Sequence, residues 1–111
     1  MPPSKFPIPQ GTLDMLILQV LSVSPTHGYG IAQKLQLISR EAVQVNQGSL
    51  YPALHRLEQK GWLRSSWRES ETGRDARFYA ITRAGQKQLA VEKKTWDRLS
   101  AAVNLIFNEG D

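Results

Sequence analysis

No cysteine occurs among the 111 residues of the chain. This absence excludes disulfide scaffolds, thiolate zinc sites and cysteine nucleophiles. The two histidines, His27 and His55, have no third candidate ligand at metal-binding spacing. The remaining polar residues do not supply a nucleophile, a base and an orienting group. We therefore expect no catalytic residue, no metal site and no cofactor, so the chain is predicted not to be an enzyme.

The sequence also lacks a long apolar run. Its longest uncharged stretch, residues 15–33, is interrupted by Pro25 and Gly28, so it cannot cross a bilayer as one apolar helix. Residues 1–10 contain four prolines, and no apolar run follows Lys5. This pattern favours an extended N-terminal segment over a signal peptide. We expect a cytoplasmic protein that does not enter the membrane.

Charge of either sign is scarce in the first third of the chain, where residues 1–33 carry only Lys5 and Asp14. The whole chain has 14 basic and 10 acidic residues, a formal net charge of +4. Residues 55–87 hold eight basic and four acidic groups. The basic excess therefore lies in the middle third of the chain, which is where we expect an anionic partner to bind.

Apolar residues at helical spacing predict three helices in the first 61 residues. The first begins at an expected N-cap, Thr12, with Asp14 in its first turn. It is apolar nearly all round, so it must be buried on more than one side, and a second subunit could supply the extra cover. The second helix follows a break at residues 24–28. The third has Asn46 or Ser49 as its N-cap. The apolar residues at helical spacing are, in the first helix, Leu13, Leu16, Ile17, Val20 and Leu21; in the second, Ile31, Leu35 and Ile38; and in the third, Leu50, Leu54 and Leu57.

The period then changes to that of strands. Residues 62–69 and 77–82 are rich in aromatic and β-branched residues, and a cluster of turn formers at 70–75 separates them. This pattern predicts a two-stranded hairpin. A lone hairpin is not stable in water. It is expected to fold back onto the helices through Leu63, Trp67, Tyr79 and Ile81.

A final long helix is expected after Thr82, with an apolar seam at heptad-like spacing. The order of elements is that of a winged helix-turn-helix with an added C-terminal helix, a mainly α fold with a small β-hairpin. We expect an extended segment at 1–10, a winged helix-turn-helix domain at 11–82 and a dimerisation helix at 83–111. The seam of the last helix comprises Leu89, Trp96, Leu99, Val103 and Ile106.

The third helix carries the sharpest functional hypothesis. If its leucines face the core, its outer face could enter the major groove of DNA with the N-terminus first. An ordinary solvated face fits the periodicity equally well. The residues predicted on this face are Gln47, Ser49, Tyr51, Pro52, His55 and Arg56.

The hairpin turn is a second candidate for DNA contact. Gly73 and Arg74 in the turn, with Arg77 beside it, place guanidinium groups on a protruding loop that suits phosphate or minor-groove contact. A charged turn is more often a means of keeping a protein in solution. Acidic neighbours also dilute the positive field, since Glu69, Glu71 and Asp75 lie in the same segment.

Trp96 lies in the middle of the predicted C-terminal seam. Core packing between two subunits is the favoured interpretation of a large aromatic residue there. The alternative is a wall of a flat apolar pocket between subunits, on which an aromatic compound could stack. Glu92 and Asp97 nearby would favour planar cations.

Four segments carry a family resemblance: residues 27–31 (HGYGI), 48–61 (GSLYPALHRLEQKG), 73–74 (GR) and 77–85 (RFYAITRAG). They resemble the PadR family of bacterial transcriptional regulators. The resemblance implies a homodimeric winged-helix repressor that binds inverted-repeat operators in double-stranded DNA. It also implies a third helix in the major groove and a hairpin against the adjacent backbone or minor groove.

The resemblance further implies that the last helix packs on the first helix of the partner subunit. In its short form the chain resembles members of the family that bind planar aromatic or drug-like compounds between the subunits. The dimer residues expected on this basis are Leu13, Leu16, Leu89, Trp96, Leu99, Val103 and Ile106, and the effector residues are Met15, Leu18, Trp96 and Leu99.

One departure from the family pattern concerns the hairpin. Asp75 and Ala76 stand where the family often continues with basic residues, so this hairpin is less basic than usual. The alternative interpretation is therefore a winged-helix protein-interaction or ligand-binding module without specific DNA binding.

Overall fold

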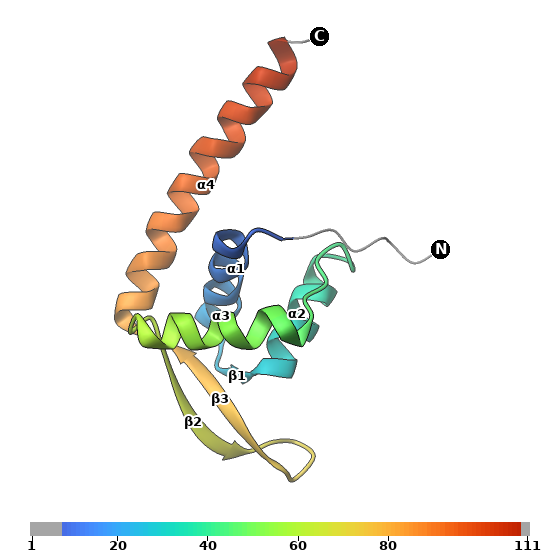
Figure 1. Cartoon of the computed structure of the whole chain (residues 1–111), viewed down its shortest axis with the longest axis vertical. Helices are drawn as coiled ribbons and strands as arrows, with labels where there is room; N and C mark the ends of the chain where they lie inside the picture. The colour runs from blue at the N-terminus through green and yellow to red at the C-terminus, as the bar shows by residue number, and fades with distance from the viewer. Residues whose placement is uncertain (1–7, 110–111) are drawn as a thin grey trace.

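The computed structural model describes residues 8–109 (Figure 1). It is mainly helical, with a small antiparallel sheet and a long C-terminal helix, as the sequence predicts. Of the N-terminal segment expected to be extended, residues 1–7 lie outside the described part. The elements in chain order are α1 (Gln10–Val23), β1 (Thr26–His27), α2 (Gly28–Ile38), α3 (Gln47–Gln59), β2 (Leu63–Glu69), β3 (Asp75–Ile81) and α4 (Arg83–Glu109).

The first helix, α1, is the centre of the core. It packs against α2, α3, α4 and β3, so its own chain supplies most of the cover that an all-round apolar helix requires. Its fully buried side chains are Leu13, Ile17, Leu18, Val20 and Leu21.

The start of α1 differs from the prediction. The helix begins at Gln10 rather than after a Thr12 cap, and Asp14 therefore lies beyond the first turn. Pro9 is the N-cap residue, and its carbonyl accepts the first helical hydrogen bond from Leu13 N at 3.0 Å. Proline suits this position because its φ is already fixed near the helical value and its missing N–H is not needed there.

The predicted hairpin is part of a three-stranded sheet. Thr26 and His27, expected to be a simple break, form β1 and pair with Tyr79 and Phe78 of β3, giving the strand order β1-β3-β2. The third strand gives the hairpin an additional hydrogen-bonded edge. Strands β2 and β3, with the turn at residues 70–74 that joins them, form the wing.

The wing packs on the helices only at its base. Leu63 and Tyr79 are buried and Ile81 is partly buried, as predicted. The prediction for Trp67 is wrong, because its side chain is 68% exposed. Trp67 pairs with Arg77 further along the hairpin, where its side chain lines an open hollow shared with residues of α2 and α3.

Local capping sets where three helices begin. Asn46, rather than Ser49, caps α3, and its Oδ1 accepts from Ser49 N at 2.9 Å. Thr82 caps α4, with Oγ1 accepting from Gly85 N at 3.0 Å. His27 caps α2 through Nδ1, which accepts from Gly30 N at 3.0 Å. These side chains satisfy amide groups that a helix N-terminus leaves unpaired.

The end of α3 is fixed by Gly61, which has φ +78°. Gly61 N donates to Glu58 O and Trp62 N donates to Leu57 O, both at 3.0 Å. This pair of bonds is a Schellman motif, and glycine adopts the required left-handed conformation without steric cost. The chain thereby turns directly from α3 into β2.

The last helix, α4, leaves the body of the molecule, and its C-terminal half stands clear of the other elements (Figure 1). Its only fully buried residues are Gly85 and Leu89. Further along, Trp96, Leu99 and Ile106 are exposed. Within residues 8–109, no helix is long and apolar enough to cross a membrane.

We predict that Gly85→Ala lowers the free energy of unfolding by about 1–3 kcal/mol. A Cβ at Gly85 would collide with the Trp62 carbonyl oxygen, and it would lie 2.8 Å from Ile81 Cγ1. Backbone on one side and β3 on the other leave little room for adjustment. Urea unfolding measures the loss. The matched control is Gly11→Ala in α1, where no atom lies within 4 Å of the new Cβ. Equal stabilities of the two variants would contradict the prediction.

Candidate nucleic-acid interface

One side of α3 is exposed from its first residue to its last turn. Leu50, Ala53, Leu54 and Leu57 anchor the opposite side in the core. Of the six residues predicted on the outer face, five are exposed in the structure: Gln47, Ser49, Tyr51, Pro52 and His55. The periodicity of the leucines thus placed these five side chains on a common accessible surface.

The sixth residue, Arg56, is held against α1. Its Nη2 donates to Asp14 Oδ1 at 3.0 Å, and both side chains are largely buried. Burial raises the pKa of the Asp14 carboxyl, while the hydrogen bond and charge of Arg56 oppose this shift. Since the ionised carboxylate is disfavoured by burial, the pair fixes where α3 lies more than it stabilises the fold.

Arg77, also predicted to contact DNA, bridges the wing and α3. Its Nε donates to Ser65 Oγ at 2.9 Å, and its Nη2 lies 3.4 Å from Glu58 Oε1. Ser65 in turn donates to the Glu58 carboxylate. This network ties β2 and β3 to α3. Because the Glu58 carboxylate neutralises part of the positive charge of Arg77, this arginine attracts an external anion less strongly.

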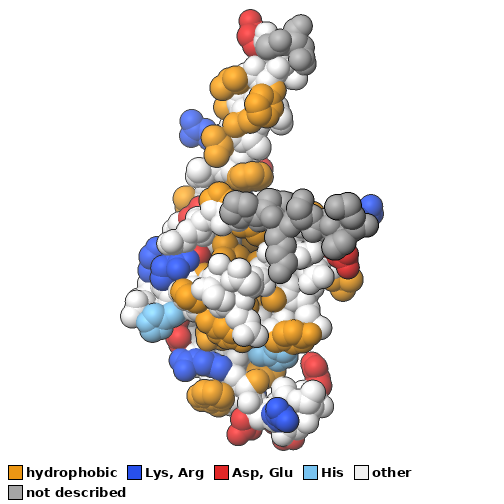
Figure 2. Space-filling model, turned by 45° about the vertical axis from the view of Figure 1, so that its right-hand side comes forward, with side chains coloured by type: hydrophobic (Ala, Val, Ile, Leu, Met, Phe, Trp, Pro, Cys, Tyr) orange, Lys and Arg blue, Asp and Glu red, His pale blue; other side chains and the backbone are white. Residues whose placement is uncertain are grey.

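Arg74 is exposed in the turn of the wing. The turn is closed by Ser70 N donating to Arg74 O at 2.8 Å, and Gly73 supplies the positive φ of +82°. Among residues 8–109, Arg74 forms no ion pair. Figure 2 shows basic and acidic side chains mixed at this lower end of the molecule. Of the two wing arginines predicted to contact DNA, Arg74 and Arg77, Arg74 is therefore the one whose charge is available to a phosphate.

A hollow of 630 Å³, here called the wing groove, separates the wing from the first turns of α2 and α3. Tyr51 lies on one wall and Trp67 on the other. Tyr29 and Gln33 of α2 also line it, and sequence reasoning missed both. The sequence did offer one signal: Tyr29 and Gln33 are four residues apart in the second helix, so they lie one turn apart on the same side of it.

The position of the Tyr51 ring depends on a glycine. A Cβ at Gly28 would lie 2.8 Å from Tyr51 Cε1, so only glycine at position 28 lets the Tyr51 ring, on α3, approach the start of α2 this closely. Tyr79 lines the same groove from β3, and burial raises the pKa of its hydroxyl. The aromatic wall of the groove is therefore set by packing between three elements.

A second groove, of 340 Å³, lies between α1 and α4. Two of the predicted effector residues, Met15 and Trp96, line it together with Leu16 and Leu89. Its polar lining consists of Gln19, Lys93 and Asp97.

The other predicted effector and dimer residues are placed differently. Leu18 and Leu13 are buried in the core, and so is most of Leu89. Leu99 is exposed on α4 and does not line the α1–α4 groove. Val103 is partly exposed. Among the predicted effector and dimer residues, the exposed ones therefore lie on α4 beyond Leu89.

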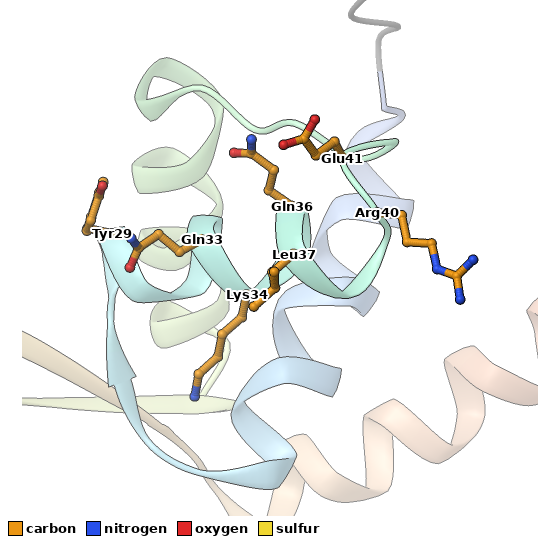
Figure 3. Close-up of a pocket in the computed structure, with 7 residues that line it drawn as sticks. All are labelled: Tyr29, Gln33, Lys34, Gln36, Leu37, Arg40 and Glu41. Carbon is orange, nitrogen blue, oxygen red and sulfur yellow. The ribbon is translucent and has the colours of Figure 1, made fainter. Parts of the chain in front are cut away.

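A third hollow, of 690 Å³, surrounds the outer side of α2 (Figure 3). Its lining side chains diverge: Lys34, Arg40 and Glu41 point in different directions from the helix. A binding site needs polar groups that converge on one point. In the described part of the chain, no group of three His, Asp or Glu residues is placed to hold a metal ion.

Comparison with known proteins gives a consistent answer. Residues 17–91 match the Transcriptional regulator PadR-like family. The transcriptional regulator Rv3488 of Mycobacterium tuberculosis is 37% identical over 87 residues, covering 78% of each protein.

Solved structures share the fold. A protein from Streptococcus mutans UA159 is 28% identical, with a TM-score of 0.82 and coverage of 95% of this chain and 94% of that one. A PadR-like transcriptional regulator from Bacillus cereus is 30% identical, with a TM-score of 0.75 and coverage of 88% and 93%. The matched family consists of transcriptional regulators rather than enzymes. The chain belongs to the PadR-like family of transcriptional regulators.

Proposed function

We propose that the protein is a dimeric repressor that binds an inverted-repeat operator in double-stranded DNA. The observation that carries this proposal is the outer face of α3, where five exposed side chains stand beside a protruding wing. An α-helix fits the major groove, and side chains in its first turns can reach base edges. In this proposal residues 11–82 bind DNA and residues 83–111 hold two copies together.

The apolar face of α4 supports dimerisation. Trp96 is 47% exposed and Ile106 is 70% exposed, and Leu99 lies between them on the same side of the helix. Side chains of this size on one stripe favour burial against a second helix. A two-fold dimer would present two α3 helices to half-sites about one helical turn apart, roughly 34–36 Å.

Net charge supports a salt-dependent interaction with DNA. Two copies at +4 each give the dimer a formal charge of +8. Each phosphate neutralised on binding lowers the logarithm of the affinity by about 0.9 per logarithm of salt. The wing contributes little net charge because acidic residues surround Arg74.

The α1–α4 groove is the proposed effector site. The indole of Trp96 offers a flat apolar surface for an aromatic compound, and the lining carries the opposite charges of Asp97 and Lys93 beside it. A ligand there would bear on both α1 and α4. Because α1 also holds α3 through Asp14 and Arg56, a shift of α4 against α1 would change the spacing of the two recognition helices.

The first prediction of this proposal is preferential binding to the upstream region of the protein's own gene. Fluorescence anisotropy with a labelled upstream duplex and a scrambled duplex, across a salt series, measures it. We expect tighter binding to the upstream duplex, weakening as salt rises. If neither duplex is preferred, binding sequences are selected from random duplexes. Failure to select any sequence would favour the alternative, a winged-helix module without specific DNA binding, which the weakly basic wing suggests.

A second prediction concerns Tyr51. We expect Tyr51→Ala to weaken binding to the selected operator by about 1–3 kcal/mol more than binding to scrambled DNA, because an exposed side chain in the first turns of α3 reaches a base. The matched control is Gln59→Ala, an exposed position in the last turn of the same helix. Equal losses on both duplexes would remove Tyr51 from sequence recognition.

A third prediction concerns assembly. Ile106→Glu places a charge on the exposed apolar stripe of α4 and is expected to convert dimers to monomers at micromolar concentration. Sedimentation equilibrium measures the mass. Leu105→Glu is the control, since Leu105 is equally exposed and lies about 100° round the helix from Ile106. Dimers that survive Ile106→Glu would show that the stripe is not the interface.

A further inference from the structure

One side of α4 carries a row of basic side chains. They follow one another at intervals of four, seven and four residues, which keeps them within about 60° of each other around the helix and spreads them over about 22 Å of its length. All four are exposed, and within residues 8–109 none of them forms an ion pair. This basic row comprises Arg83, Lys87, Lys94 and Arg98.

The basic row faces away from the core. Gly85 and Leu89 are the fully buried residues of α4, so they mark the side of the helix that meets the core. Lys87 stands about 200° round the helix from each of them. Trp96, in the apolar stripe proposed to form the dimer, lies about 160° from Arg98. Dimer formation through that stripe therefore leaves the basic row open to solvent.

The row carries as much charge as the whole chain. The chain has 14 basic and 10 acidic residues, so the four cations of the row equal its formal excess of +4, and the other ten basic residues are balanced by ten acidic ones. The acidic residues of α4 within the same span lie on other sides of the helix. Glu92 accepts a hydrogen bond from Gln88 at 2.8 Å, and Asp97 lines the α1–α4 groove. An uninterrupted row of this charge attracts a polyanion.

The composition of the row favours nucleic acid over protein as that polyanion. Protein–protein interfaces are poor in lysine and have apolar centres. Between residues 83 and 98, Val91 is the large apolar side chain exposed on the side of the basic row. Interfaces with DNA are more polar and more positively charged, and basic residues along one face of a helix are typical of them.

We propose that the basic row is a second DNA-binding surface, which holds the phosphates of a duplex segment other than the one bound by α3. Ammonium and guanidinium groups form charge-assisted hydrogen bonds with phosphate oxygens. A duplex carries one phosphate per about 1.7 Å of its axis, so a row about 22 Å long meets more than enough of them for four contacts. Contacts to phosphates do not depend on base sequence.

The position of the row allows two DNA segments to be held at once. The wing and the C-terminal half of α4 lie at opposite ends of the molecule (Figure 1). A straight duplex held by α3 and the wing is therefore not expected to cover the outer side of α4. The protein then joins two stretches of DNA, a step that rests on the proposed function, in which α3 binds the operator.

The test measures the bridging of two duplexes. Two random-sequence duplexes of about 30 bp, one carrying a donor dye and the other an acceptor dye, are mixed with the wild-type chain in about 50 mM salt. We expect energy transfer between the dyes, because both surfaces bind DNA of any sequence at low salt. The transfer is expected to fall as salt rises.

Charge reversal in the row separates its contribution from that of α3. Arg98→Glu is expected to weaken binding of the second duplex about tenfold, because a repulsion replaces one phosphate contact. Anisotropy with the selected operator duplex is expected to stay near the wild-type value. The matched control is Arg40→Glu, which makes the same change of charge at an exposed arginine after α2 and is expected to leave both measurements unchanged. Circular dichroism and sedimentation show whether each variant remains folded and dimeric.

The outcomes separate this inference from the proposed function. Energy transfer that Arg98→Glu removes and Arg40→Glu retains supports the second surface. If the wild-type chain gives no transfer, or if transfer survives Arg98→Glu, the inference is overturned, while operator binding keeps the proposed function standing. Transfer that depends on the row without preference for any operator supports the inference and overturns the proposed function. Labelled poly-L-glutamate provides the last outcome: if the wild-type chain binds it, Arg98→Glu does not and no duplexes are bridged, the row recognises an acidic polypeptide and the inference is overturned.

Discussion

The burial of α1 is the constraint on which the rest of the structure depends. Five of its side chains are almost fully excluded from water, and together they touch α2, α3, α4 and the sheet. In a chain of 111 residues there is no second core to hold these elements. The proposed recognition helix α3, the base of the wing and the start of α4 are therefore all positioned against one helix. Any movement of α1 relative to its neighbours alters several elements together, because a close-packed core transmits displacement.

This arrangement gives α1 a role on two sides of the molecule. On one side Asp14 pairs with Arg56 of α3. One residue further along the helix, Met15 lines the groove that contains Trp96. The proposed effector site and the proposed DNA-reading helix are thus joined by adjacent residues of one rigid element. Coupling between two such sites requires an element that both of them contact, and α1 meets that requirement.

Two arginines near the proposed DNA-reading face are paired within the protein. Arg56 pairs with Asp14, and Arg77 pairs with Glu58. These pairs set the position of α3 and of the wing. What remains toward solvent is aromatic, polar and basic, and the wing arginines without an ion pair within the described residues are Arg64, Arg68 and Arg74. Hydrogen bonding and shape are therefore expected to act together with the remaining positive charge in DNA recognition.

The sequence by itself determined the order of the four helices and the hairpin, the buried side of α3 and its C-terminal end, and it left Asn46 and Ser49 as the two candidates for the N-cap of α3. These features follow from local rules: leucines at helical spacing, side chains that can cap a helix, and Gly61 in the left-handed conformation. Tertiary structure decided which polar side chains remain available. Arg56 was expected to face DNA, yet its partner lies 42 residues away in the sequence, and no local pattern reveals such a contact. The same holds for β1, which exists only because β3 passes beside it, and for Trp67, whose exposure depends on the open hollow between the wing and the helices. Spacing along the chain assigns a residue to one side of an element, whereas the fold decides what that side meets.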